Sequence, residues 1–117
     1  MNPSPLQLRV KLNATIKFGP GKADLLQHIA QTGSISAAAR AMRMSYKRAW
    51  QLVDDMNQAF RAPLVQTTAG GSQGGGAAIT PLGDQVLNSY RNLQRLANTA
   101  SRKELAALLR LTRRDAE

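Results

Sequence analysis

The chain has no cysteine, a single histidine and few aromatic residues, which make up 4% of its 117 positions. Without cysteine it forms no disulfides, no thiolate metal sites and no cysteine nucleophile. His28, without convergent acids, supplies neither a metal site nor a catalytic one, and we interpret it as a surface or boundary residue. No apolar run approaches the roughly 20 residues of a transmembrane helix. We therefore expect a cytoplasmic protein that is not an enzyme, holds no metal and enters no membrane.

Acidic residues are also scarce: 7 Asp and Glu stand against 16 Lys and Arg, which gives a net charge of +9. Residues 1–53 contain eight basic residues and one acid, whereas residues 54–79 carry a net charge of −1 and residues 80–117 one of +3. A basic surface of this size attracts a polyanion, such as nucleic acid, an anionic membrane or an acidic protein. The concentration of charge in the first half modestly favours nucleic acid.

Local patterns in this first half predict a strand followed by three helices. Apolar and polar residues alternate over 6–12, which is typical of a half-buried strand, and Gly19-Pro20-Gly21 then interrupts the backbone. Ser34 and Ser45 each precede a run with helical spacing, where a serine hydroxyl accepts from free backbone amides. The predicted helices cover residues 22–32, 35–42 and 46–60.

The second half predicts a hairpin and a long helix. Two short strands, 64–68 and 77–79, flank residues 69–76, which contain five glycines. This pattern indicates a β-hairpin with a glycine-rich tip. Thr80-Pro81 then begins an amphipathic helix, which can break where Ser101 opens a capping-box spacing. We divide the chain into a domain of residues 1–80 and a C-terminal helix with a basic tail over 81–117.

This order of elements is that of a winged helix-turn-helix domain, which is an α+β and mostly helical fold. Here it has an N-terminal strand, a two-stranded glycine-rich wing and a long C-terminal helix for dimerisation. In such a domain the third helix offers its first turns to the major groove of DNA. Trp50 lies one turn beyond Tyr46 and is expected to brace it. The candidates for this reading turn are Ser45, Tyr46, Lys47, Arg48 and Gln51.

The glycine-rich tip differs from the phosphate-binding loop of nucleotide hydrolases. It lacks the Lys-Ser/Thr ending of that motif, and it precedes a strand rather than a helix. We therefore interpret it as the tip of a wing, because glycine has no Cβ to block a close approach to a DNA backbone.

Several short motifs carry a family resemblance. Gly33-Ser-Ile-Ser-Ala-Ala-Ala-Arg40 resembles the second helix of LysR-type winged-helix domains. Narrower matches are Ser45-Tyr-Lys-Arg-Ala-Trp50, Met56-Asn-Gln58, Leu64-Val65, the glycine-rich run of 70–77 and Thr80-Pro-Leu-Gly83. Together they resemble the N-terminal DNA-binding domain of the ModE family, the molybdate-responsive bacterial transcription regulators. The resemblance runs from about residue 6 to 97.

The resemblance implies a homodimer that binds a palindromic promoter site in double-stranded DNA. By matching position, Ser34 and Ser36 would contact phosphate and the reading turn would enter the major groove. The wing tip would consist of Gly70, Gly71, Ser72 and Gln73. Members of the family continue into molybdate-binding domains, for which these 117 residues have no room. We therefore expect no molybdate and no other cofactor.

The long helix carries an apolar stripe at steps of three and four residues. We interpret this stripe as a dimer interface rather than an intramolecular core, since so long a helix overhangs a small domain. It consists of Leu82, Val86, Tyr90, Leu93, Leu96, Ala97 and Ala100. Two other functions fit parts of the sequence: a non-specific architectural DNA-binding protein, and an adaptor that docks a partner protein on the long helix.

Overall fold

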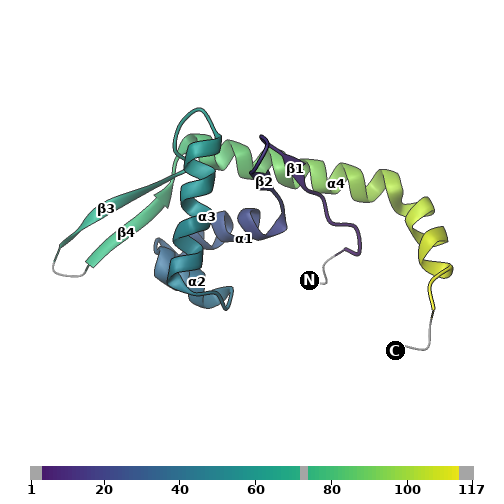
Figure 1. Ribbon diagram of the computed structural model, residues 1–117, viewed down its shortest axis with the longest axis horizontal. Coiled ribbons are helices and arrows are strands. Elements are labelled where there is room, and N and C mark those ends of the chain that lie inside the picture. Colours follow the sequence, from purple (N-terminus) through teal and green to yellow (C-terminus); the bar gives the residue numbers. More distant parts are fainter. Residues whose placement is uncertain (1–3, 72–73, 114–117) are drawn as a thin grey trace.

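The computed structural model describes residues 4–71 and 74–113 (Figure 1). A short antiparallel pair, β1 (Val10–Lys11) and β2 (Lys17–Phe18), precedes three helices, α1 (Pro20–Thr32), α2 (Ile35–Ala41) and α3 (Tyr46–Ala59). The hairpin β3 (Val65–Gly71) and β4 (Gly74–Ile79) and the long helix α4 (Pro81–Arg110) complete the fold. The hairpin and the far end of α4 project in opposite directions from the helical body. This is the α+β, mostly helical winged helix-turn-helix arrangement that the sequence predicts.

Residues at the helix ends fix the turn between α1 and α2 and the start of α3. Gly33 ends α1 in the left-handed conformation, with φ 71°, and its N–H donates to the Ile29 carbonyl oxygen at 2.8 Å. The hydroxyls of Ser34 and Ser45 each accept from an N–H in the first turn of the helix that follows, both at 3.0 Å. These caps satisfy amides that a helix leaves free and so set where α2 and α3 begin.

The core lies where the three short helices meet, and aromatic rings extend it under α4. Its largest fully buried side chains are Leu25, Leu26, Ile29, Val53, Met56 and Leu64. Phe18 of β2 packs edge-to-face against Phe60 and Tyr90, with ring centroids 6.0 Å and 5.1 Å apart. This aromatic cluster joins the β1–β2 pair, the end of α3 and α4 into one body.

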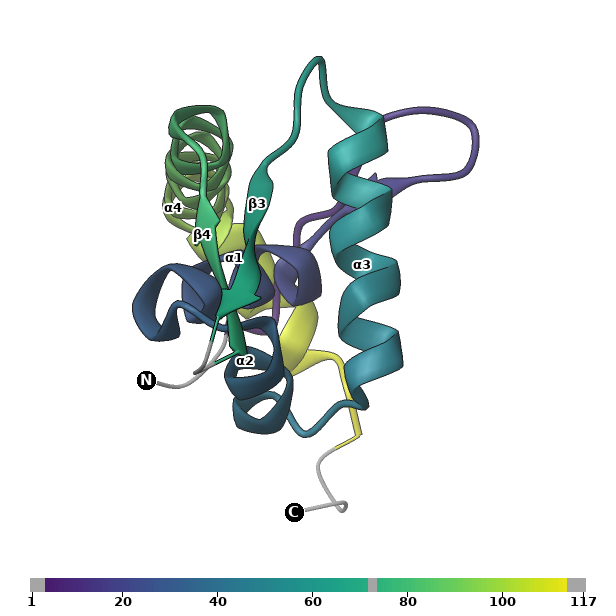
Figure 2. The same cartoon turned by 90° about the vertical axis from the view of Figure 1, so that its left-hand side faces the viewer.

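Hydrogen bonds at its base attach the β3–β4 hairpin to the helices. The Ala77 N–H donates to the Gly33 carbonyl oxygen at 2.9 Å. On the other side, the Asn57 side chain of α3 bonds to the backbone of Leu64 and Val65. The base of the wing is therefore held from both ends of the helix-turn-helix, and Figure 2 shows the hairpin beside α3.

Some element boundaries differ from those predicted. The alternating segment 6–12 is a strand only at Val10–Lys11, because only these residues meet a partner strand. The residues before it run along α4 instead, where the Leu8 carbonyl oxygen accepts from the Tyr90 hydroxyl at 2.5 Å. Helix α1 begins earlier than predicted, at Pro20, since proline is tolerated in the first turn of a helix.

Helix α4 is continuous over 30 residues and does not break at Ser101. The capping box does not form, because carbonyls of the preceding turn already accept from the amides that Ser101 would cap. The ribbon nevertheless curves over its last turns (Figure 1). Within residues 4–71 and 74–113, no helix has the length and apolar character to span a bilayer.

Candidate nucleic-acid interface

The first turns of α3 present the predicted reading turn to solvent. The Ser45 hydroxyl is occupied as the helix cap and accepts from the Arg48 N–H, so it orders this backbone. Beyond it, Tyr46, Lys47 and Gln51 are exposed. A phenol, an ammonium and an amide therefore lie close together at the start of one helix, and these groups suit hydrogen bonds to base edges and phosphates.

Helix α3 buries one face and exposes the opposite one. The buried face consists of Ala49, Leu52, Val53 and Met56. At 3.6 residues per turn, the opposite face carries Lys47 and Gln51, followed by Asp54 and Gln58. We call these four residues the exposed row. The positive charge of the row, at Lys47, lies in the first turns of α3. The negative charge of Asp54 limits the positive potential to that end of the row.

Arg48 lies on the flank of α3 beside α1 and not in the exposed row. Burial lowers the pKa of the Lys22 ammonium, the Asp55 carboxylate 4.0 Å away raises it, and the positive charge of Arg48 lowers it. Lys22 also donates to the Lys17 carbonyl oxygen at 2.7 Å. Arg48 therefore adds positive potential to one edge of α3, next to a second cation.

Helix α2 contributes a basic side chain that the sequence analysis did not single out. The Arg40 guanidinium donates to the Ser36 hydroxyl at 3.0 Å, and both residues are exposed. Ser34, by contrast, is half-buried and uses its hydroxyl as the α2 cap. The spacing of Ser36 and Arg40 was a usable signal, because residues four apart on a helix share a face.

A hollow of about 250 Å³ lies between α3 and the wing, and we call it the α3–wing cleft. It is lined by Ser34, Ile35, Ser36, Tyr46, Trp50, Thr67, Thr68, Gly76 and Ala77. The Tyr46 and Trp50 rings meet edge-to-face with centroids 6.2 Å apart, which confirms the predicted contact. Trp50 is nevertheless 37% exposed and Tyr46 55%, so both rings retain surface that can meet a ligand.

The wing narrows toward a tip that is only partly described. Gly70 and Gly71 end β3, whereas the predicted contact residues Ser72 and Gln73 lie outside the described residues. Nearer the base, the Thr68 hydroxyl accepts from the Gly76 N–H at 3.0 Å and so ties the two strands together. The register shifts between Thr68 and Gly71, which is typical of an irregular glycine-rich hairpin.

The apolar stripe of α4 divides into two parts, and the first packs within the chain. Tyr90 is only 2% exposed, and the N-terminal segment covers it through the hydrogen bond to Leu8. It is a core residue here, which corrects its placement in an exposed dimer interface. Leu82 and Val86 are half-buried against the same core.

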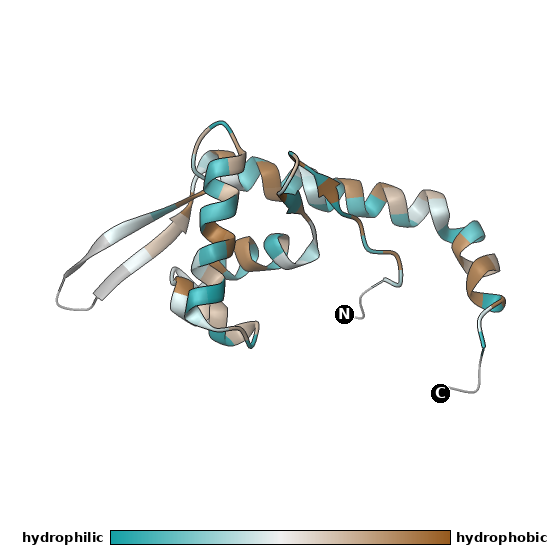
Figure 3. Cartoon of the chain, in the orientation of Figure 1, coloured by the Kyte–Doolittle hydropathy of each residue, from teal (hydrophilic) through white to brown (hydrophobic). Residues whose placement is uncertain are grey.

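The second part of the stripe is largely exposed to solvent. Leu96 is 59% exposed, Leu93 and Ala100 are also exposed, and Ala97 is half-buried. Figure 3 shows hydrophobic bands that recur along α4 as far as its last turns. A helix that leaves such a stripe in water is stabilised when another surface covers it.

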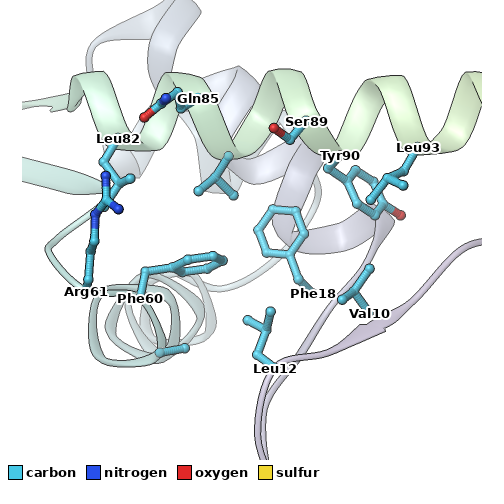
Figure 4. Close-up of a pocket in the computed structure, with 12 residues that line it drawn as sticks. Val10, Leu12, Phe18, Phe60, Arg61, Leu82, Gln85, Ser89, Tyr90 and Leu93 are labelled. Atoms are coloured by element: carbon cyan, nitrogen blue, oxygen red, sulfur yellow. The ribbon is translucent and has the colours of Figure 1, made fainter.

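A groove beside this stripe is shown in Figure 4. It has a volume of about 500 Å³ and lies between β1–β2, the end of α3 and the first half of α4. Phe18, Phe60 and Tyr90 line it from three elements, with Leu93 at one end and Arg61 at the other. Leu93 belongs both to the exposed stripe and to the lining of the groove, so the two meet at this residue.

The described residues do not gather a metal-binding set: no three acidic or histidine side chains come together in them. His28 is half-buried on α1, which is the boundary position expected for it. In the described residues, His28 and the acidic side chains therefore do not form a second candidate site besides the surface formed by α3, α2 and the wing.

Comparisons with known proteins give the family and the fold. Residues 22–84 match the family model described as bacterial regulatory helix-turn-helix protein, lysR family. Among solved structures, the chain resembles the DNA-binding domain of CbnR in a complex with DNA. The TM-score is 0.58 over 75% of this chain and 95% of that one, and the identity of 18% makes this a likeness of fold.

The chain is also similar to several curated bacterial proteins. It is 46% identical to the molybdenum-pterin-binding protein MopB of Rhodobacter capsulatus, over 63% of this chain and 27% of that protein. It is 36% identical to the transcriptional regulator ModE of Haemophilus influenzae, over 81% of this chain and 37% of that protein. It is 38% identical to the dual regulator ModE of Escherichia coli K12, over 80% of this chain and 36% of that protein. The matched regions span about a third of these relatives.

The fold and its exposed third helix define a winged helix-turn-helix protein. The chain belongs to the lysR family of bacterial regulatory helix-turn-helix proteins, and its helix-turn-helix domain is of the ModE type. The family is one of regulators and not of enzymes, as expected from the sequence.

Proposed function

We propose that this chain binds duplex DNA in a sequence-specific manner and regulates transcription in the bacterial cytoplasm. The observation that carries the proposal is the exposed row of α3, in which Lys47 and Gln51 point away from the body. An α-helix fits the major groove, where the Gln51 amide distinguishes base pairs by their hydrogen-bonding edges while the Lys47 ammonium meets a phosphate. The wing lies beside α3, in position to reach the neighbouring backbone.

The charge distribution supports a nucleic-acid partner. Lys47, Arg40 and Arg48 stand around the start of α3, while residues 54–79 carry a net charge of −1. Lys and Arg on phosphates release counterions, so affinity should fall steeply as salt rises. Hydrogen bonds from the exposed row to bases should then determine which sequence is preferred.

We propose further that the chain acts as a homodimer on a palindromic site. The exposed stripe of α4 meets the groove of Figure 4 at Leu93, and Leu96 is exposed one turn further along. A two-fold axis would bring the same surface of a second copy against it, because such interfaces are self-complementary. The dimer would then present two copies of α3 to two half-sites.

The proposal does not give molybdate a role in DNA binding by these residues. In the proposed complex, the exposed row makes the DNA contacts and the stripe of α4 makes the dimer contacts. We therefore expect molybdate to leave the affinity of this chain for DNA unchanged.

The test is selection of bound duplexes from a random pool, followed by titration against the selected duplex and a scrambled one. Fluorescence anisotropy of labelled DNA at two salt concentrations, with and without molybdate, measures each affinity. A strong preference for the selected duplex supports the proposal. Equal affinities would instead indicate an architectural DNA-binding protein, and no binding at low salt would indicate an adaptor that uses α4.

A further inference from the structure

The α3–wing cleft differs in chemical character from the exposed row. Its α3 side is aromatic, with Trp50 beside Tyr46, and hydroxyl-bearing side chains from α2 and β3 also line it. Ser36 comes from α2 on one side and Thr67 from β3 on the other. Lys47 and Gln51 do not line the hollow, so base reading by the exposed row leaves it unused.

The alternation of apolar and hydrogen-bonding groups matches one part of a duplex. Base pairs in intact DNA are stacked, and their faces are closed to a side chain that approaches from outside. The sugar–phosphate backbone, by contrast, offers a largely apolar deoxyribose next to anionic oxygens that accept hydrogen bonds. Aromatic rings can pack on the sugar, while hydroxyl groups can donate to the phosphate.

The positive charge at the rim of the α3–wing cleft also favours a sugar–phosphate backbone as its occupant. The Arg40 guanidinium is held beside Ser36 by the 3.0 Å hydrogen bond between them. This places a cation at the edge of the cleft without filling it. The described residues of the cleft include no acidic side chain, so no carboxylate opposes a phosphate there.

We infer that the α3–wing cleft holds one strand of the sugar–phosphate backbone of the bound duplex. The Trp50 ring packs on a deoxyribose, and the Thr67 hydroxyl donates to a phosphate oxygen next to it. This inference rests on the proposed function and adds to it: Trp50 and Thr67 contribute to affinity, whereas the choice of sequence belongs to the exposed row.

The chain itself provides the probe, because Trp50 is its only tryptophan. Quenching of its fluorescence by acrylamide, measured with and without the selected duplex, reports whether the cleft is occupied. We expect bound DNA to lower the quenching constant several-fold. If anisotropy shows that labelled DNA is bound while quenching is unchanged, the inference is wrong but the proposed function stands.

Two substitutions separate a backbone contact from base reading. Thr67→Val removes the hydroxyl and keeps the side-chain shape and strand preference, so it should fold normally. It should weaken binding about tenfold, which is typical of a hydrogen bond to a charged group. Trp50→Leu should weaken binding by a similar factor. Both losses should be equal on selected and scrambled duplexes.

Thr99→Val is the matched control, because Thr99 is exposed on α4 and does not line the cleft. It should leave both affinities unchanged. Two outcomes overturn the inference: a Thr67→Val protein that binds like the wild type, and a Trp50→Leu protein that loses affinity only for the selected duplex. The second outcome would make Trp50 a base-reading residue.

Discussion

Asn57 and Val65 exchange hydrogen bonds between α3 and the first residue of the wing. The Asn57 Oδ1 accepts from the Val65 N–H at 3.1 Å, and its Nδ2 donates to the Val65 carbonyl oxygen at 3.1 Å. The same Oδ1 also accepts from the Leu64 N–H at 2.8 Å. One side chain thus satisfies the backbone where the chain leaves α3 and turns into β3.

Asn57→Ala should therefore destabilise the fold. It removes all three hydrogen bonds and leaves amides of the buried Leu64 and Val65 without these partners, at a cost of about 2–3 kcal/mol. Urea unfolding followed by circular dichroism measures the loss. Gln58→Ala is the control, since the neighbouring Gln58 is exposed, and we expect it to change stability by less than about 0.5 kcal/mol. Equal effects of the two substitutions would contradict this role.

Gly83 allows α4 to approach the backbone of the segment before β3. A Cβ at this position would collide with the Leu64 carbonyl oxygen and lie 3.3 Å from the Ile79 Cβ. Because the carbonyl belongs to the backbone, it cannot turn aside, and Gly83→Ala should cost about 2 kcal/mol or more.

Gly21→Ala is the matched control for Gly83→Ala. A Cβ on Gly21, also in the first turn of a helix, meets no atom within 4 Å. Alanine there should stabilise the protein by up to about 1 kcal/mol, since it favours the helix. Thermal unfolding of both variants checks the pair, and the account of Gly83 fails if both shift stability in the same direction.

Tyr90 should make stability sensitive to alkaline pH. Burial raises the pKa of its phenol, with the Arg91 charge acting in the opposite direction. Because the folded pKa is higher than the unfolded one, the stabilisation is present below about pH 10 and is lost as pH rises through the folded pKa. The free energy of unfolding should therefore fall in this range.

The measurement compares wild type with Tyr90→Phe by urea unfolding from about pH 8 to about pH 11. The variant loses the hydrogen bond to Leu8, so it should be less stable by about 1 kcal/mol at the lower pH. The difference between the two proteins should shrink as pH rises, since only the wild type carries the ionisable phenol. A difference that stays constant across the range would contradict the role assigned to Tyr90.

The exposed row predicts two kinds of DNA-binding defect. Lys47→Ala should weaken binding to selected and scrambled duplexes alike and reduce the salt slope by about one, if its ammonium meets a phosphate. Gln51→Ala should instead reduce the preference for the selected duplex by about 1–3 kcal/mol. Anisotropy titrations over a series of salt concentrations distinguish the two. If Lys47→Ala instead reduced the preference, and Gln51→Ala weakened binding to both duplexes alike, the assignment of phosphate and base contacts would be reversed.

The exposed stripe of α4 predicts how the proposed homodimer can be broken. Leu96→Glu places two charges in a two-fold apolar interface and should raise the dimer dissociation constant by at least about a hundredfold. Sedimentation velocity measures it. Asn88→Glu adds the same charge at an exposed position on another face of α4 and should leave association unchanged. If Leu96→Glu sediments like the wild type, the interface lies elsewhere.

Much of the fold could be predicted from the sequence because its signals are local. Ser34 and Ser45 cap the helices that follow them, and Gly33 ends α1, as the residue types at these single positions predict. The length of the first strand could not be predicted, because pairing depends on a partner. Alternation over 6–12 predicts a strand, but only two residues meet β2.

The candidate site was predictable to a similar extent. Positions on α3 follow from helical periodicity, so the exposed Lys47 and Gln51 could be identified in advance. Tyr90 could not be separated from the rest of its stripe, because its burial depends on Leu8, 82 positions away. The α3–wing cleft could not be predicted either, because α2, α3 and β3 form it only after they pack together.

The hydrogen bond from Ala77 to Gly33 has a consequence for the shape of DNA that this protein accepts. It joins β4 to the turn between α1 and α2 and so restrains the base of the wing against the helix pair. The distance between α3 in one groove and the wing over the next stretch of backbone is then set inside the protein. A duplex with a different groove width would meet only one of these elements. Selectivity for DNA geometry is thus built into a hydrogen bond within the protein.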